Sequence, residues 1–147
     1  MSGWMGIILR VDLSSGKIEK EPLSKELGVN YAGGRGINVR LLYDEVKPGI
    51  DAFDPENRLI FGTGPLTGTM LPSGRINITS KSPLTGIYGE SDVGGRWGTE
   101  LKKAGYDGVI VKGDRKSTFT SGSKMEDWKF VTPSISGALI PTRLVMF

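Results

Sequence analysis

Glycine-rich loops that carry an arginine are the parts of this sequence best suited to binding chemistry. Two of them contain Gly-Gly-Arg, at residues 33–35 and 94–96, and a third loop places Arg75 just before an expected strand. Glycine lets an anionic ligand approach backbone N–H groups closely, and a guanidinium adds charge-assisted hydrogen bonds. The same patterns are also typical of tight turns that lead into helices, and on spacing alone this plainer interpretation is favoured.

Known phosphate-binding signatures and several catalytic chemistries are absent from the sequence. No loop matches the Gly-x-Gly-x-x-Gly dinucleotide fingerprint after a strand, and no phosphate-binding loop ending in Gly-Lys-Ser/Thr occurs. The chain has no cysteine and no histidine, which excludes Ser-His or Cys-His nucleophiles, zinc centres and cysteine-ligated iron–sulfur clusters on this chain. Catalysis by these residues would therefore depend on carboxylates, lysine, tyrosine or a bound cofactor.

Charge and hydropathy argue against nucleic acid and membrane as partners. The 147 residues include 19 basic and 16 acidic side chains, giving a net charge of +3, and the basic residues are scattered rather than gathered into a stripe. The apolar runs are far shorter than the ~18 residues of a membrane span, and the first residues lack a signal-peptide pattern. We therefore expect a cytoplasmic protein.

The elements that must position these loops alternate irregularly between strands and helices. Period-two apolar residues predict a strand at 7–13, with Ile7, Leu9 and Val11 on one face. Further expected strands are 17–22, 58–63, 77–80 and 108–112, and expected helices are 37–46 and 99–104. Because this order lacks a regular βαβ rhythm, the predicted fold class is α+β with mixed strands and short helices.

Composition changes abruptly towards the end of the chain. Of the 22 glycines only Gly122 and Gly137 lie beyond residue 114, and the last 33 residues contain nine Ser or Thr. The sequence therefore divides into residues 1–114 and a tail at 115–147.

Residues 1–114 resemble the N-terminal domain of the tungsten-containing aldehyde ferredoxin oxidoreductases. The resemblance covers about three quarters of the chain and rests on ordered loop motifs. They are residues 3–6 (Gly-Trp-Met-Gly), 9–13 (Leu-Arg-Val-Asp-Leu), 33–36 (Gly-Gly-Arg-Gly), 54–60 (Asp-Pro-Glu-Asn-Arg-Leu-Ile), 64–69 (Gly-Pro-Leu-Thr-Gly-Thr), 81–86 (Lys-Ser-Pro-Leu-Thr-Gly), 94–98 (Gly-Gly-Arg-Trp-Gly), 100–102 (Glu-Leu-Lys) and 104–107 (Ala-Gly-Tyr-Asp).

This resemblance implies a specific cofactor chemistry. Members of the family oxidise aldehydes to carboxylic acids at a tungstopterin, in which two molybdopterins hold the tungsten. A [4Fe-4S] cluster passes the electrons to ferredoxin. Their N-terminal domain, built from intertwined repeats and incomplete here, forms the base on which the cofactor sits. The glycine loops would then hold pterin and phosphate groups while the cofactor carries the chemistry.

By motif position, the resemblance implies four cofactor-binding residues and no catalytic or metal-ligating side chain. The four are Arg75, Asp92, Gly94 and Gly95. Family members often have Asn where Asp92 stands, so here the site loses a donor and gains a negative charge beside an anionic cofactor.

The tail from residue 115 leaves the family pattern, and we interpret it as frameshifted. When each codon's third base is combined with the next codon's first two, residues 119–147 read as a sequence similar to the family's next segment. The pairs Met125-Glu126 and Trp128-Lys129 force Gly and Glu in that frame, in agreement with it. We predict a one-nucleotide shift near Lys116; a divergent but genuine tail is the alternative.

The sequence thus predicts an N-terminal fragment of a tungstopterin-dependent aldehyde:ferredoxin oxidoreductase that contributes part of the cofactor base and is inactive by itself. The cluster ligands would belong to the parent enzyme outside this chain. Apolar surface left open by missing neighbours favours a homodimer or a partner subunit. The alternative is a stand-alone module that binds a pterin or nucleotide, or docks on another subunit, without catalysis.

Overall fold

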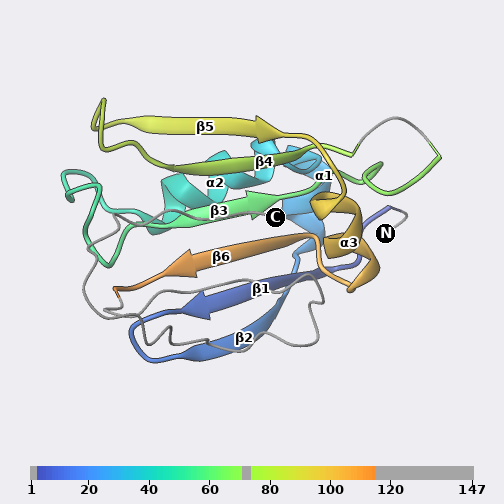
Figure 1. The fold of residues 1–147 in the computed structure, drawn as a ribbon, viewed down its shortest axis with the longest axis horizontal. Helices are drawn as coiled ribbons and strands as arrows, with labels where there is room; N and C mark the ends of the chain where they lie inside the picture. Colours follow the sequence, from blue (N-terminus) through green and yellow to red (C-terminus); the bar gives the residue numbers. More distant parts are fainter. Residues whose placement is uncertain (1–2, 71–73, 115–147) are drawn as a thin grey trace, which may run out of the picture. The chain divides into compact units, whose positions relative to one another are not determined.

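The computed structural model describes residues 3–70 and 74–114, which form one mixed β-sheet with helices on its faces (Figure 1). The strands of the sheet lie in the order β2-β1-β6-β3-β4-β5. In chain order the elements are β1 (Ile7–Asp12), β2 (Lys17–Pro22), α1 (Lys25–Tyr31), α2 (Arg35–Glu45), β3 (Leu59–Gly62), β4 (Ile76–Lys81), β5 (Tyr88–Val93), α3 (Trp97–Lys103) and β6 (Gly108–Lys112).

Strand pairing makes the sheet mixed. β1 and β2 form an antiparallel hairpin with Ile7 opposite Pro22, and the last strand, β6, runs parallel to β1 and antiparallel to β3. β3, β4 and β5 continue as an antiparallel meander. The predicted α+β class is confirmed, because only one parallel pair occurs among the described strands.

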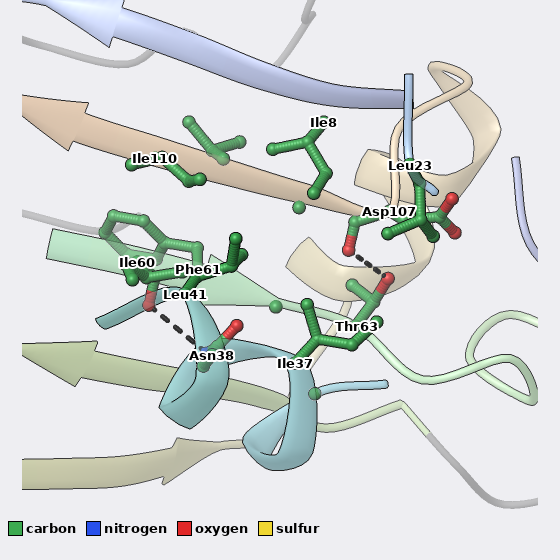
Figure 2. Close-up of a pocket in the computed structure, with 14 residues that line it drawn as sticks. Ile8, Leu23, Ile37, Asn38, Leu41, Ile60, Phe61, Thr63, Asp107 and Ile110 are labelled. Atoms are coloured by element: carbon green, nitrogen blue, oxygen red, sulfur yellow. Dashed lines mark hydrogen bonds between the residues drawn. The ribbon is translucent and has the colours of Figure 1, made fainter. Parts of the chain in front are cut away.

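The main core lies between the sheet and helices α1 and α2. Ile8, Ile60 and Ile110 project from three neighbouring strands and pack against Ile37 and Leu41 of α2 (Figure 2). All five side chains are at most 7% exposed. Helix α2 therefore lies fixed across β3 and β4, and its first residue is placed beside the strand ends.

The opposite face of the sheet is covered at one end by α3. The rings of Phe61 on β3 and Trp97 on α3 lie 5.4 Å apart, centroid to centroid. Leu9 and Val11, predicted to share one face of β1, are both buried, and Ile8, next to Leu9 in the chain, is buried as well, at 3% exposure. Helices on both faces of the sheet bury successive residues of the same strand.

Two elements escaped prediction and the boundaries of others shifted by one or two residues. β5 is a polar edge strand with mostly exposed residues, and α1 is a short helix capped by Ser24, whose side chain accepts from the backbone N–H of Leu27. No helix in residues 3–70 and 74–114 is long and apolar enough to cross a bilayer. The predicted domain boundary and frameshifted tail concern residues from 115 on, which lie outside the described residues.

Candidate functional site

The glycine loops of the sequence converge at one end of the sheet, where β3 and β5 end and β4 begins (Figure 1). The N–H of Gly34 donates to the carbonyl of Thr63 at 2.8 Å. A Cβ on Gly33 would lie 2.9 Å from the same Thr63 oxygen, and the Gly33 φ of +148° is itself unfavourable for other residues. Glycine is therefore required where the loop before α2 crosses the loop after β3.

Register brings the predicted site residues of β4 and β5 together. Asn77 pairs with Asp92 and Ile76 with Val93, so continuing the pairing one residue further places Arg75 opposite Gly94. The next pair is Gly74 and Gly95, where a Cβ on Gly74 would lie 3.2 Å from the Gly95 carbonyl oxygen. All four residues predicted for the site, Arg75, Asp92, Gly94 and Gly95, thus lie at one corner of the sheet.

Within residues 3–70 and 74–114, this corner is open and its Arg75 is unpaired. Apart from their chain neighbours, no heavy atom of the described residues lies within 4 Å of a Cβ built on Gly94 or Gly95, and Gly95 has a φ of +102°. Arg75 is exposed, and its guanidinium makes no hydrogen bond or ion pair within residues 3–70 and 74–114. The bare backbone beside a free guanidinium fits a flat ligand that carries a phosphate.

The carboxylate of Asp92 is held by protein groups on both oxygens. Oδ1 accepts from Nδ2 of Asn77 at 3.0 Å, and Oδ2 lies 3.3 Å from a terminal nitrogen of Arg35. That nitrogen also contacts Glu90 at 2.7 Å. Arg35 therefore offsets part of the charge of Glu90 and Asp92, and these contacts link α2 to the edge strand.

Tyr88 completes this row of polar side chains on the edge strand. Its hydroxyl donates to Oε2 of Glu90 at 2.6 Å. Burial, followed by this hydrogen bond and the charge of Glu90, raises the pKa of Tyr88 above its usual value. The phenol accordingly remains protonated and holds Glu90 beside Arg35.

A buried amide network supports the corner from beneath. Asn38 of α2 is 1% exposed, and its Nδ2 donates to the Asn77 carbonyl at 2.9 Å and to Asn77 Oδ1 at 3.1 Å. Thr79 donates its hydroxyl to the same Oδ1 at 2.7 Å. Gly62 must lack a side chain, because a Cβ there would lie 2.2 Å from Asn38 Oδ1. These bonds fix the orientation of Asn77 and so of Asp92.

Sequence reasoning missed the partners that organise the site. The sequence singles out Arg35 only as part of its glycine loop and gives no role to Asn77 or Glu90. The signal was present in the strand register, since Asn77 and Asp92 occupy paired positions. To use that signal, one would first have to predict β5, and its sequence lacks the apolar alternation of a typical strand.

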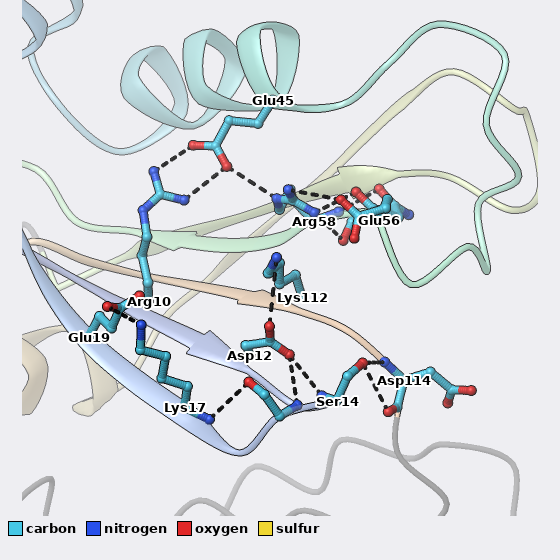
Figure 3. Close-up of polar contacts among 12 residues, drawn as sticks. Arg10, Asp12, Ser14, Lys17, Glu19, Glu45, Glu56, Arg58, Lys112 and Asp114 are labelled. Atoms are coloured by element: carbon cyan, nitrogen blue, oxygen red, sulfur yellow. Dashed lines mark hydrogen bonds and ion pairs between the residues drawn. The ribbon is translucent and has the colours of Figure 1, made fainter.

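A second polar cluster lies further along the same face of the sheet, towards the ends of β1 and β6 (Figure 3). Glu45 receives hydrogen bonds from Arg10 at 2.6 Å and 2.9 Å and from Arg58 at 3.1 Å. Burial raises the pKa of Glu45, but the hydrogen bonds and charges of these arginines outweigh it and lower the pKa below its usual value. The same contacts raise the pKa of Arg10.

This cluster borders a cavity of about 350 Å³ whose lining includes the cations Arg10, Arg58 and Lys112. Every guanidinium nitrogen of Arg10 and of Arg58 already contacts a carboxylate or a backbone carbonyl, and Lys112 pairs with Asp12. We therefore assign the cluster to structure rather than to ligand binding. No group of three or more acidic, histidine or cysteine side chains suited to a metal ion occurs among the described residues.

Comparison with known proteins decides the family. The model of the aldehyde ferredoxin oxidoreductase N-terminal domain matches residues 8–120. The chain belongs to the aldehyde ferredoxin oxidoreductase family. It is 49% identical over 114 residues to the tungsten-containing aldehyde ferredoxin oxidoreductase of Pyrococcus horikoshii, a match that covers 77% of this chain and 19% of the relative.

Other members of the aldehyde ferredoxin oxidoreductase family show the same partial coverage. The aliphatic sulfonate oxidoreductase WOR-like subunit of Pyrococcus furiosus is 40% identical over 121 residues, which is 80% of this chain and 19% of the relative. A solved structure, the active site complex BamBC of benzoyl coenzyme A reductase with 1,5-dienoyl-CoA, matches with a TM-score of 0.76 and 39% identity over 80% of this chain and 18% of that one. The chain thus spans about a fifth of the length of these relatives.

Proposed function

We propose that the described domain forms part of the base that binds the pterin cofactor of an aldehyde ferredoxin oxidoreductase. The proposed contacts are Arg75, Asp92, Gly94 and Gly95. The observation that carries this proposal is the corner itself, where, among the described residues, Arg75 has no partner and lies beside glycines with open space above their backbone. Family membership supplies the class of ligand.

The four residues would divide the work by chemistry. The Arg75 guanidinium presents a fork of donors suited to a phosphate group. Gly94 and Gly95 let a planar ring approach the main chain without a Cβ in the way. Asp92 would act mainly by fixing the end of β5, because both of its carboxylate oxygens already accept contacts from Asn77 and Arg35.

Metal and redox chemistry would come from the cofactor and from residues outside this chain. Relatives that match this sequence are named as tungsten-containing, and the bound tungstopterin would supply the oxidation of an aldehyde to a carboxylic acid with ferredoxin as electron acceptor. A [4Fe-4S] cluster would need ligands from elsewhere, since the chain has no cysteine. This chain's own contribution is to hold and orient the pterin.

Cofactor retention tests the proposal. The 147-residue chain is produced in a host that makes the tungsten–pterin cofactor, purified anaerobically, and assayed for tungsten by mass spectrometry and for pterin by fluorescence after oxidation. Pterin should copurify with the wild type and fall several-fold in Arg75→Ala. Arg40→Ala, which removes an arginine whose partner is Asp44 on the same helix, should retain it. Equal pterin in all three proteins, or none in the wild type, contradicts the proposal.

A further inference from the structure

Arg35 offers hydrogen-bond donors that the protein itself does not use. One terminal nitrogen of its guanidinium contacts both Glu90 and Asp92, at 2.7 Å and 3.3 Å. The other terminal nitrogen and Nε make no hydrogen bond within residues 3–70 and 74–114, and the side chain is 60% exposed. An arginine has five N–H donors, so most of them remain available to a ligand.

The position of Arg35 places those donors beside the proposed cofactor site. Asp92 pairs with Asn77, and Arg75 precedes Asn77 by two residues, so alternation puts both on the face that α2 covers. Two residues of strand span roughly 6.6 Å. Arg35 therefore reaches the same face, about one pleat from the position of Arg75.

A second cation would offset the negative charge at this corner. Glu90 and Asp92 both face the corner, and two carboxylates would repel a phosphate unless a positive charge lay between them and the ligand. Arg35 contacts both. Because these contacts also hold a long side chain in one place, binding would cost less conformational entropy than for a free arginine.

We infer that Arg35 is a second phosphate-binding residue, which Glu90 and Asp92 hold in place next to Arg75. This inference rests on the proposed function, because it assigns Arg35 to the same ligand. It specifies that the phosphate group, rather than the pterin ring, is what Arg35 recognises.

A pair of fluorescent ligands separates phosphate recognition from ring recognition. The full chain is titrated with an oxidised pterin that carries a phosphate monoester, and with the same pterin after phosphatase treatment, and binding is followed by fluorescence anisotropy. In Arg35→Gln, affinity for the phosphorylated pterin should fall about tenfold, as expected for a lost charge-assisted hydrogen bond. Affinity for the dephosphorylated pterin should stay within twofold.

Two control variants and a stability measurement test whether the loss of affinity comes from the lost phosphate contact. Arg35→Lys keeps the positive charge, but a lysine lacks the planar fork of donors that lets one arginine contact two carboxylates and a phosphate at once. Affinity for the phosphorylated pterin should therefore fall about threefold, and affinity for the dephosphorylated pterin should not change. Arg40→Gln, an equal charge change on the same helix, should bind both ligands like the wild type. Thermal unfolding of each variant shows whether it is folded; if Arg35→Gln is not, Arg35→Lys decides.

The outcomes distinguish this inference from the proposed function. If the wild type binds neither pterin, the proposed function and the inference both fail. If the wild type binds and Arg75→Ala weakens the phosphorylated ligand while the Arg35 variants do not, only the inference fails. Equal weakening of both ligands by an Arg35 variant gives Arg35 a purely structural role and also overturns the inference.

Discussion

The buried ion pair between Lys102 and Asp107 fastens the N-terminal segment to the sheet end that carries the glycine loops. Lys102 Nζ lies 2.6 Å from Asp107 Oδ1 and donates to the Gly3 carbonyl at 2.7 Å. Asp107 also accepts from the backbone N–H groups of Met5 at 3.0 Å and Gly6 at 2.6 Å. Both carboxylate oxygens thus accept hydrogen bonds and the ammonium donates two, although both side chains are almost fully buried.

Removal of one partner should be costly. Lys102→Met leaves the Asp107 carboxylate buried with only its two backbone donors, and we expect unfolding to become easier by about 3–5 kcal/mol. Lys103→Met is the matched control, since Lys103 is exposed and, within residues 3–70 and 74–114, pairs only with Glu100; it should cost less than about 0.5 kcal/mol. Urea denaturation followed by tryptophan fluorescence measures both, and equal effects would contradict this account of the pair.

Two glycines of the Gly-Gly-Arg-Trp-Gly motif should respond to alanine in opposite ways. A Cβ on Gly98 would lie 2.6 Å from Cγ2 of Ile76, whereas nothing lies within 4 Å of one on Gly94. Gly98→Ala should therefore destabilise the fold by about 1–3 kcal/mol through overpacking.

Gly94→Ala should leave stability within about 0.5 kcal/mol and reduce affinity for the phosphorylated pterin several-fold, because the new methyl group occupies the ligand's approach to the backbone. Thermal unfolding and the anisotropy titration test the two halves separately. Unchanged pterin affinity in a stable Gly94→Ala protein would remove Gly94 from the site.

At the scale of elements, α2 is fixed to the sheet at both of its ends. Its first residue, Arg35, pairs with Glu90 and Asp92 of β5. Its last residue, Glu45, accepts from Arg10 of β1 and from Arg58, just before β3 (Figure 3). The helix therefore spans the sheet from the edge strand to β1, and its orientation depends on charge as well as on the apolar core.

Because the pKa of Glu45 is lowered, the stability that its ion pairs with Arg10 and Arg58 contribute depends on pH, and the direction of this dependence can be stated. A carboxyl whose pKa is lower in the folded state stabilises the fold above its unfolded pKa and loses that contribution as pH falls through the folded pKa. The wild type should thus lose stability below about pH 4.5, the ordinary glutamate value.

In Glu45→Gln this part of the acid sensitivity should disappear, with lower stability at neutral pH. Asp44→Asn, which changes the neighbouring exposed carboxylate, should retain the acid sensitivity. Urea denaturation between pH 3 and pH 7 checks both variants. An unchanged pH profile in Glu45→Gln would show that the arginines do not hold Glu45 in its charged form.

Prediction of the elements succeeded where apolar periodicity was strong and failed where tertiary contacts decide. β6 was located at its observed bounds, because Gly108–Lys112 is a central, mostly buried strand. β5 went unnoticed because an edge strand exposes most of its side chains, and its sequence Tyr-Gly-Glu-Ser-Asp-Val has no alternating pattern. α1 is only seven residues long, and it forms through its cap and its packing rather than through periodicity.

At the scale of the whole molecule, the two ends of the sheet differ in the state of their cations. At one end Arg75 has no partner in the described part of the chain, and Arg35 uses only one of its nitrogens there, beside open glycine backbone. Towards the other end Arg10, Arg58 and Lys112 are each paired with a carboxylate. Every guanidinium nitrogen of Arg10 and Arg58 is already engaged there, so a phosphate should bind at the glycine-loop corner instead.

The residues of the candidate site came from motif resemblance, whereas their spacing favoured ordinary turns. Pattern could not show that Arg75 and Gly94 lie side by side, since 19 residues separate them and the pairing of β4 with β5 brings them together. Nor could it show that Asp92 contacts Arg35, which lies 57 positions earlier in the chain, at the start of α2. These relations depend on strand register and helix packing.

Chemical-shift mapping of the ¹⁵N-labelled 147-residue chain with the phosphorylated pterin tests the central claim most directly. If the corner binds the cofactor, the backbone amides that shift should cluster at residues 33–36, 74–77 and 92–96, and the amides around Arg10 and Lys112 should stay in place. Shifts gathered around Arg10 and Lys112, or no saturable shifts in the folded protein, would contradict the assignment of this domain as the pterin-binding base.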